Sequence, residues 1–423
     1  MFRLLPVKPK FSRKHRRVLQ DLVIDQNGPG TILHDFEAIL TFLKDQNLPL
    51  TGMHQLPRRV LPEINALLAR PLQHGLKRPL QKSYPHIHGL YLLVRASGLT
   101  FVGQTPKKPL LIVDDEVHQA WAGLNPTERY CSLLEAWLLQ GRPEMVGEEQ
   151  HGRYWMPDGF SEWGGFFLRI PDGGQQVAGD ADAESWLRYS PGWHNLGLLD
   201  LFGLVSVRHG PPKAGKGWRI AHIRRTPLGD ALLAALYVGF FGDLDKLIEL
   251  EAQGEMPSGV LQPVLQPYFP TWQKTLRVPE WTFREGTHVF RVSFGATWRR
   301  IAIPAGTNLD ALASIILNAF DFDHDHFYRF SYQNRLGVWE HVNHPRLDRD
   351  GPKTNQVQIG DVPLGLGQTM TYLFDFGDCW EFDVTLEYVD PLDAALPVPT
   401  APAIIEAHGQ PPEQYPRWEG EEW

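Results

Sequence analysis

The sequence has only two cysteines, Cys131 and Cys379, in 423 residues. Two cysteines so far apart cannot build a disulfide framework or a cysteine-rich zinc site, which excludes the class of small, disulfide-stabilised secreted domains. Few cysteines are typical of proteins in a reducing compartment, so we expect a cytoplasmic protein.

Long apolar runs are also missing. The most apolar stretch, ALLAALYVGFFG at 231–242, is too short to cross a bilayer. The basic N-terminus has no apolar core of signal-peptide length. The sequence therefore predicts a protein that is neither secreted nor embedded in a membrane, and we expect no membrane partner.

The usual signatures of covalent and nucleotide-dependent catalysis are absent as well. The chain has no nucleophile elbow, no phosphate-binding loop and no dinucleotide-binding fingerprint. Their absence favours a protein without enzymatic activity and without a required cofactor.

One triplet, Asp375-Phe376-Gly377, matches the kinase motif that holds magnesium, and Asp350 precedes Asn355 by the spacing of a kinase catalytic loop. Only 46 residues follow the triplet, which is too few for the helical lobe of a kinase. Aromatic and aliphatic residues alternate with polar ones on both sides of it, and a Gly-Asp pair stands between the two runs. We interpret this segment as a β-hairpin.

What the sequence does contain is enough apolar material for several cores. Hydrophobic residues make up 43% of the chain, and it has 14 Trp, 12 Tyr and 22 Phe. A chain of this length is expected to form two or three domains. The net charge is −8, but residues 1–82 carry 14 Lys and Arg against 6 Asp and Glu. The positive charge is therefore concentrated near the N-terminus.

Periodicity and turn signals predict a multi-domain chain with a mostly α N-terminal region and a C-terminal α+β domain. Helix–turn–helix patterns followed by short hairpins appear twice, which is typical of winged-helix-like units. Start signals for helices include Asn125 with Glu128 and the pair Thr226-Pro227. The expected segments are a basic helical region with a winged-helix-like unit at 1–140, an irregular Gly/Trp-rich segment at 141–190, a second winged-helix-like unit at 191–256, a Pro-rich linker at 257–278, the α+β domain at 279–390 and a Pro-rich acidic tail at 391–423.

The second winged-helix-like unit has a basic hairpin. From Leu204 to Gly229 there is no acidic residue. Cationic side chains on a hairpin suit the phosphates of double-stranded DNA, although they can also protect an exposed sheet edge from strand pairing. The candidate nucleic-acid-binding residues are Arg208, Lys213, Lys216, Arg219, Arg224 and Arg225.

A histidine-rich acidic stretch, DFDHDHFYRF, offers a candidate metal site. Its alternate residues His324 and His326 would share one side of a strand, and Asp375 and Asp378 would be near if the strands pair. Imidazoles and carboxylates suit a divalent metal such as zinc, manganese or iron. The alternative is a turn at the end of a helix with a buried, hydrogen-bonded His326. The same argument applies more weakly to PHIHG at 85–89.

The C-terminal region also resembles a known family. The stretches WRRIAIPAGTNLDALASIILNAFDFDHDHFYRF and IGDVPLGLGQTMTYLFDFGDCWEFDV resemble the plasmid pRiA4b ORF-3-like domain, also described as an insertion-element passenger of TnpR type. The resemblance covers 279–390, and the pattern from LPRRVLPEINALL to NPTERYCSLLEAWL, residues 56–138, resembles the additional region of longer members. It implies a bacterial origin, a small α+β fold and an association with mobile elements, and it implies no particular activity.

From charge placement and fold outline we predict a non-enzymatic protein that binds nucleic acid through the basic hairpin, with the C-terminal domain as a module for a partner or a ligand. Two alternatives stay open. One is a metal-dependent enzyme that uses the His and Asp residues of the C-terminal domain. The other is a protein-interaction scaffold with a protein partner.

Overall fold

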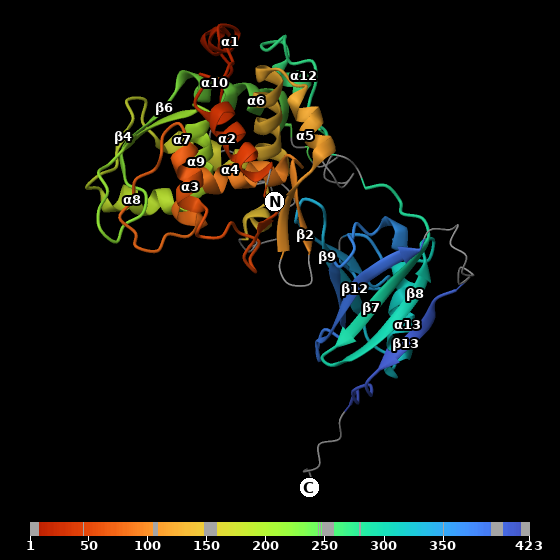
Figure 1. Ribbon diagram of the computed structural model, residues 1–423. Coiled ribbons are helices and arrows are strands. Elements are labelled where there is room, and N and C mark those ends of the chain that lie inside the picture. Colours follow the sequence, from red (N-terminus) through yellow and green to blue (C-terminus); the bar gives the residue numbers. More distant parts are fainter. Residues whose placement is uncertain are drawn as a thin grey trace. The chain divides into compact units, whose positions relative to one another are not determined.

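The structure is a computed structural model, and the chain divides into two compact units. Unit 1 comprises Met1–Val102 and Lys108–Pro279, and unit 2 comprises Gly103–Lys107 and Glu280–Trp423. Helices dominate unit 1 and a large antiparallel sheet dominates unit 2, so the predicted fold class is confirmed (Figure 1). The described residues are 8–44, 46–104, 109–147, 159–243, 245, 247, 258–278, 281–349, 351–390 and 401–415.

Unit 1 contains two segments with the same order of elements, namely helix, strand, two helices and two strands. In both, the first strand pairs with the last, which lies in the middle of a three-stranded sheet. The first segment comprises α2 (Ile32–Lys44), β1 (Leu48–Pro49), α3 (Leu61–Leu67), α4 (Pro85–Ala96), β2 (Thr100–Gln104) and β3 (Pro109–Val113). The second comprises α7 (Gly159–Arg169), β4 (Gln175–Gln176), α8 (Ala181–Leu187), α9 (Trp193–Leu201), β5 (Val205–His209) and β6 (Ile220–Arg225).

The second segment begins earlier than the sequence indicated. Residues 141–190 were expected to be irregular, but their described part contains α7, β4 and α8. Three glycines in α7 (GFSEWGGFFLR) weaken its helical signal, and β4 has only two residues, too few for a strand pattern.

Further helices complete unit 1. The predicted start of α6 is confirmed, because Asn125 accepts the N–H of Glu128 at 3.0 Å while the Glu128 carboxylate accepts the N–H of Asn125 at 2.9 Å. Thr226 likewise caps α10 by accepting the N–H of Gly229 at 3.0 Å. These helices are α1 (Arg13–Gln20), α5 (Asp115–Ala122), α6 (Pro126–Glu135), α10 (Pro227–Leu236) and α12 (Gln262–Leu265), with single-turn segments at Gln81–Ser83, Ala136–Gln140, Pro143–Val146, Arg188–Gly192 and Tyr237–Phe241.

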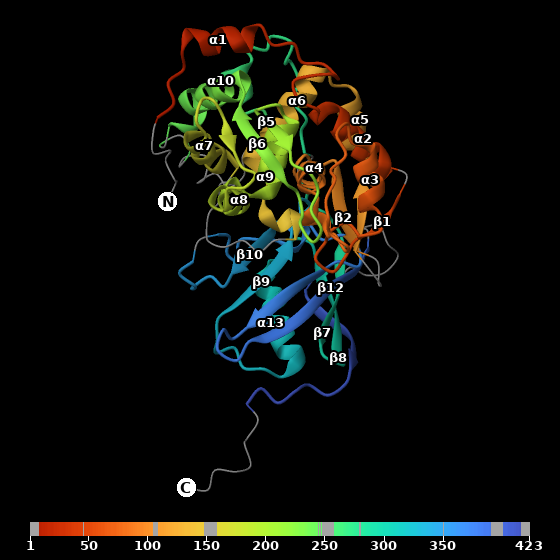
Figure 2. The ribbon, with the colours of Figure 1, turned by 90° about the vertical axis from the view of Figure 1, so that its left-hand side faces the viewer.

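The two segments pack on each other through α4 and α9, which lie side by side in Figures 1 and 2. Glycines allow the close approach. A Cβ at Gly197 would lie 2.8 Å from the carbonyl oxygen of Pro85, and a Cβ at Gly89 would lie 2.7 Å from Cγ of Leu198. Both helices are almost entirely buried, so they form the centre of unit 1.

Unit 2 is an antiparallel seven-stranded sheet in the order β10-β9-β11-β12-β7-β8-β13, with α13 packed on it. Asn308 caps α13 by accepting the N–H of Ala311 at 3.0 Å. Apolar residues of α13 and the inner strands form a single buried core. The elements are β7 (Thr287–Phe294), β8 (Thr297–Pro304), α13 (Leu309–Phe320), β9 (Tyr328–Gln333), β10 (Trp339–Asn343), the helical turn Ile359–Asp361, β11 (Thr369–Phe374), β12 (Trp380–Asp390) and β13 (Ala403–His408).

The segment around Asp375-Phe376-Gly377 is a hairpin, as predicted. Phe374 pairs with Trp380 across the turn between β11 and β12. The turn chemistry differs from the expected Gly-Asp turn, because the left-handed positions are Asp375 and Cys379, each with φ of 55°. The Asp375 carboxylate accepts the N–H of Gly377 at 2.8 Å, which fixes the start of the turn.

Candidate functional site

The basic hairpin of unit 1 consists of β5, β6 and the loop between them. On its strands Ser206 pairs with Arg224 and Arg208 with His222, so Arg208 and Arg224 share the exposed face. Lys213 and Lys216 are exposed in the loop. These four cations have no ion-pair partner within the described part of the chain.

The other two predicted cations are held in ion pairs. Arg219 lies 3.2 Å from a carboxylate oxygen of Glu184. Arg225 pairs with Asp172 and, at 3.4 Å, with Asp230, and it donates to the carbonyl oxygen of Phe167 at 3.1 Å. Asp230 directly follows the stretch that lacks acidic residues, whereas Glu184 and Asp172 lie 35 and 53 residues away from their partners and could not be inferred from sequence proximity. The structure thus brings the six residues onto one hairpin, and four of them are exposed and have no ion pair with any described residue.

The hairpin loop is fixed despite its three glycines. Gly75 donates to the carbonyl oxygen of Lys216 at 2.9 Å and accepts the N–H of Gly215 at 2.8 Å. A Cβ at Gly75 would lie 1.9 Å from the carbonyl oxygen of Lys213, so only glycine permits this contact. The lysines therefore extend from a supported backbone.

Helix α1 adds a second basic surface in unit 1. It packs against α10, beside which it lies in Figure 2. The charges of Lys14 and His15 act on Asp230, the partner of Arg225, so α1 lies close to the end of β6. Its exposed cations, with those just before it, are Lys8, Lys10, Arg13, Lys14, Arg16 and Arg17.

In a winged-helix domain, one helix directly before the wing hairpin enters the DNA groove. In the second segment of unit 1, α9 has this position in the order of elements. Residues 195–201 of α9 are all buried, and α4 covers the helix. The side chains of residues 195–201 cannot reach a base edge without opening the centre of unit 1. The side chains of this segment that can contact DNA are therefore the exposed cations of the hairpin.

In unit 2 the structure brings some of the predicted metal ligands together. Nε2 of His326 lies 3.4 Å from a carboxylate oxygen of Asp375 and 3.5 Å from one of Asp325. His324 instead contacts the Asn318 side chain at 3.0 Å, and Asp378 is exposed in the hairpin turn. His326 is 42% exposed, so it is not the buried histidine of the alternative interpretation.

A polar cavity of about 380 Å³ is lined by α13, by the segment that follows α13 and by the segment that follows β10. Tyr328 donates from its hydroxyl to the Asp310 carboxylate, and burial followed by this bond and charge raises the pKa of Tyr328. Nδ1 of His344 accepts the backbone N–H of Arg346 at 3.1 Å, so the neutral ring carries its proton on Nε2. Burial, with the charge of Arg346, lowers the pKa of His344, although Asp310 opposes this. The lining residues are Asp310, Ser314, Leu317, His324, His326, Tyr328, His344, Pro345 and Arg346.

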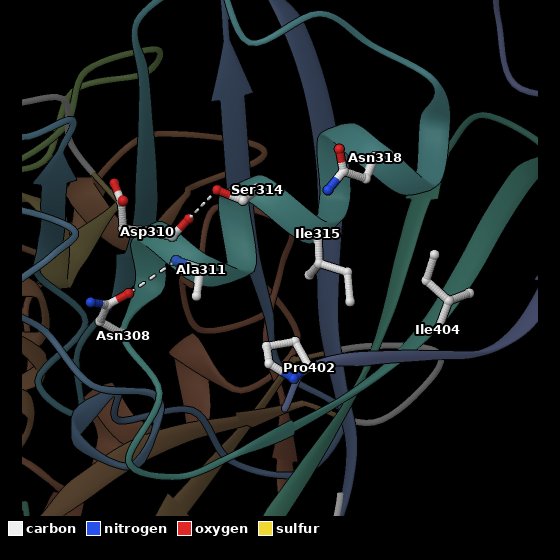
Figure 3. Close-up of a pocket in the computed structure, with 8 residues that line it drawn as sticks. All are labelled: Asn308, Asp310, Ala311, Ser314, Ile315, Asn318, Pro402 and Ile404. Atoms are coloured by element: carbon white, nitrogen blue, oxygen red, sulfur yellow. Dashed lines mark hydrogen bonds between the residues drawn. The ribbon is translucent and has the colours of Figure 1, made fainter. Parts of the chain in front are cut away.

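A second hollow of about 680 Å³ lies along the other side of α13 and shares Asp310 and Ser314 with the first (Figure 3). Figure 3 shows Ile315 directed toward the side on which Pro402 and Ile404 lie. This hollow has fewer ionisable groups than the first, so the polar cavity is the better candidate for a ligand of unit 2.

Sequence reasoning missed a cluster at the centre of unit 1. Nε2 of His86 on α4 lies 3.1 Å from Asp200 on α9, and Arg70 lies 3.0 Å from the same oxygen. Burial raises the pKa of Asp200, but the hydrogen bond and charge of His86 and the charge of Arg70 outweigh it and lower the pKa overall. Burial and the charge of His86 lower the pKa of His209 at the end of β5. The only signal in the sequence was the weak pair His86 and His88.

Cys131 does not have the environment of a nucleophile. Burial, with the charges of Glu135 and Glu128, raises the pKa of Cys131 well above its usual value, so its thiolate is disfavoured. Cys379 is exposed in the hairpin turn.

Among the described residues, no helix has the length and apolar character needed to cross a membrane.

Comparisons with known proteins match parts of the chain. No curated protein matches the chain. Among solved structures, a protein of unknown function from Methanosarcina mazei Go1 is similar at 23% identity over 30% of this chain and 72% of that one, with a TM-score of 0.26. Residues 293–418 match the model of the plasmid pRiA4b ORF-3-like protein family, so the C-terminal region carries a domain of the family that its hairpin and Trp-Arg-Arg strand resemble.

Proposed function

We propose that the chain binds double-stranded DNA through the basic hairpin and α1 of unit 1, without enzymatic activity. The observation that carries the proposal is the set of four exposed hairpin cations, which have no ion pair within the described part of the chain. Together with α1 they offer a surface on which phosphates can replace counterions. The association with mobile elements that the family resemblance implies makes DNA a suitable partner.

The proposed mode of binding is contact with the DNA backbone rather than base reading. The groove-entering position of the second segment is occupied by α9, which is buried. Arg219 and Arg225 act by holding the hairpin through Glu184, Asp172 and Asp230, and the exposed cations contact phosphates. Binding is therefore expected to depend weakly on sequence and strongly on salt.

The test is fluorescence anisotropy of a labelled duplex at several salt concentrations. If the four hairpin cations each neutralise one phosphate, they contribute about −3.6 to the slope of log K against log salt concentration, and α1 makes it steeper. A variant that changes the four to glutamine should weaken binding and reduce the slope by about that amount. The substitutions are Arg208→Gln, Lys213→Gln, Lys216→Gln and Arg224→Gln.

The matched control removes the same charge from unit 1 outside the hairpin and α1. It carries Arg58→Gln, Arg59→Gln, Lys274→Gln and Arg277→Gln, all at exposed positions. The control should bind as the parent protein does. Equal loss in both variants would mean that net charge alone attracts DNA, and the absence of binding at low salt would favour the protein-interaction scaffold.

For unit 2 we propose the role of a ligand-binding module. The polar cavity supports it, because the imidazole of His344 and the guanidinium of Arg346 offer hydrogen-bond donors to an acidic small molecule. The alternative metal-dependent enzyme draws support from the 3.4 Å approach of His326 to Asp375. Metal analysis of His326→Gln, described below, separates these two readings.

A further inference from the structure

The two segments of unit 1 meet at a group of three side chains that can ligate a metal. His86 lies in the first turn of α4, Asp200 near the end of α9 and His209 at the end of β5. One ligand atom from each lies within 4.8 Å of the other two, and the described residues contain no other group of this kind. The side chains of His86 and Asp200 are only 6% and 2% exposed.

Two imidazoles and one carboxylate form a donor set that suits Zn²⁺, and three protein ligands leave a fourth position for a water molecule. The three residues come from different elements, so their geometry depends on the packing of α4 against α9. That packing is fixed by the close contacts of Gly89 and Gly197, which would hold the ligands in place before a metal arrives.

The hydrogen bonding of the cluster is incomplete. Nδ1 of His86 and Nε2 of His209 are both buried and have no hydrogen-bond partner among the described residues. Buried polar atoms normally have a partner, because leaving one unpaired costs about 1–3 kcal/mol. Trp218 closes the site, with its ring centre 4.9 Å from that of His86 and 5.7 Å from that of His209.

Arg70 is the competitor of a metal at this site. Its guanidinium lies 3.0 Å from the Asp200 oxygen that also faces His86, but its side chain is 45% exposed. It can therefore turn toward solvent when a bound metal ion takes over the charge of the buried Asp200 carboxylate. Without a metal, Arg70 balances the buried charge of Asp200.

We propose that His86, Asp200 and His209 bind one divalent transition-metal ion, with Zn²⁺ as the preferred ion, and that this ion joins the two segments of unit 1. The site is separate from the basic hairpin surface and from the polar cavity of unit 2. Its existence does not depend on the proposed DNA binding. Arg70 weakens the affinity by competing for Asp200.

The test uses the full chain, stripped with a chelator and then titrated with Co²⁺ alone and with Zn²⁺ alone. We expect one Co²⁺ per chain, with the intense visible absorption of a tetrahedral site, and its displacement by Zn²⁺. Zn²⁺ should also raise the melting temperature, because it binds the folded state. Absence of stoichiometric Co²⁺ binding would overturn the proposal.

Two variants assign the site. Asp200→Asn keeps the shape of the side chain but removes the charged ligand, and it should weaken metal binding about 100-fold or more. Arg70→Met removes the competitor at a partly exposed position, and it should tighten binding about 10-fold, a direction that a misfolded protein would not give. Unchanged binding in Asp200→Asn, or weaker binding in Arg70→Met, would contradict the assignment.

His326→Gln is the control in unit 2. It removes the imidazole that lies beside Asp375. Both residues belong to the metal site that the sequence suggested. We expect it to leave the stoichiometry and the affinity for Co²⁺ unchanged. Loss of the bound metal in this variant would move the site to unit 2 and overturn the assignment to His86, Asp200 and His209.

Discussion

Among single residues, the buried Glu135 at the end of α6 has a strongly shifted pKa. The residue is 4% exposed, and its carboxylate accepts the backbone N–H groups of Gly259 and, at 3.2 Å, of Leu261. Burial raises the pKa of Glu135 to about 7, although these N–H groups oppose the shift. The residue thus connects α6 to the chain that precedes α12.

This shift makes unit 1 less stable as the pH rises. The native state binds a proton that the unfolded state has already lost, so the stabilisation is complete below about pH 4.5 and is lost as the pH approaches 7. The shift corresponds to roughly 3 kcal/mol. Urea unfolding of Glu135→Gln between pH 5 and pH 8 should show a flatter pH dependence than the parent protein. Exposed Glu63→Gln is the control, and equal slopes in all three proteins would contradict this prediction.

Cys379 in the β11–β12 turn allows a test of backbone strain. Its φ of 55° is a left-handed conformation that glycine adopts without a steric penalty. Cys379→Gly should therefore be about 1 kcal/mol more stable than Cys379→Ala, which keeps the strain but removes the thiol. Thermal unfolding of the two variants measures the difference. An alanine variant as stable as the glycine variant would show that the turn relaxes.

The sequence identified the hairpin at this turn but not its strained positions. Alternation and a Gly-Asp pair suffice to predict two strands and a reversal. Which residue takes the left-handed conformation depends on the turn length, and five residues, 375–379, separate the strands. Asp375 tolerates the conformation because its carboxylate binds the N–H of Gly377, a local bond that the sequence permits but does not require.

At the scale of elements, the paired helices α4 and α9 determine whether unit 1 holds together. Gly197→Ala would place its Cβ 2.8 Å from the backbone of Pro85, so the helices must separate or shift. We expect a loss of about 1–3 kcal/mol, the usual cost of overpacking. Chemical denaturation provides the measurement.

The matched substitution is Gly165→Ala in α7, where a Cβ meets nothing within 4 Å. There the better helix propensity of alanine should stabilise the protein by about 0.5–1 kcal/mol. Opposite signs at the two glycines would establish that the close approach of α4 and α9 is required. If both substitutions stabilised the protein, α4 and α9 would have space for a methyl group at position 197, and the prediction would be contradicted.

Elements with strong local signals were predictable, and those defined by distant partners were not. The capping box of α6 and the capped start of α10 lie within a few residues of sequence and were identified correctly. The two-residue strands β1 and β4 exist only because β3 and β6 pair with them. The sequence therefore predicted the repeated helices and hairpins of unit 1 but not the short strands β1 and β4. The cluster at His86 was hidden for the same reason, since His86 lies 114 residues before Asp200.

At the scale of the whole molecule, the two units have ionisable groups with opposite effects on stability. In unit 2, burial and the charge of Arg284 lower the pKa of His288 on β7 to about 4, although the backbone at Gly286 opposes the shift. A lowered histidine pKa gives a stabilisation that is present above about pH 6.5 and is lost as the pH falls toward 4. Glu135 gives unit 1 the reverse dependence.

Calorimetry of the full chain should therefore show two transitions whose response to pH is separable by mutation. When the pH falls from 7 to 5, Glu135 stabilises unit 1 and His288 destabilises unit 2. Glu135→Gln should therefore remove this stabilisation from the transition of unit 1, and His288→Leu should remove this destabilisation from the transition of unit 2. Exposed His324→Gln is the control for unit 2 and should leave both unchanged. Because the two residues lie in units with separate contacts, each variant should alter only one transition. A shift of both transitions by either variant would mean that the units unfold as one cooperative body.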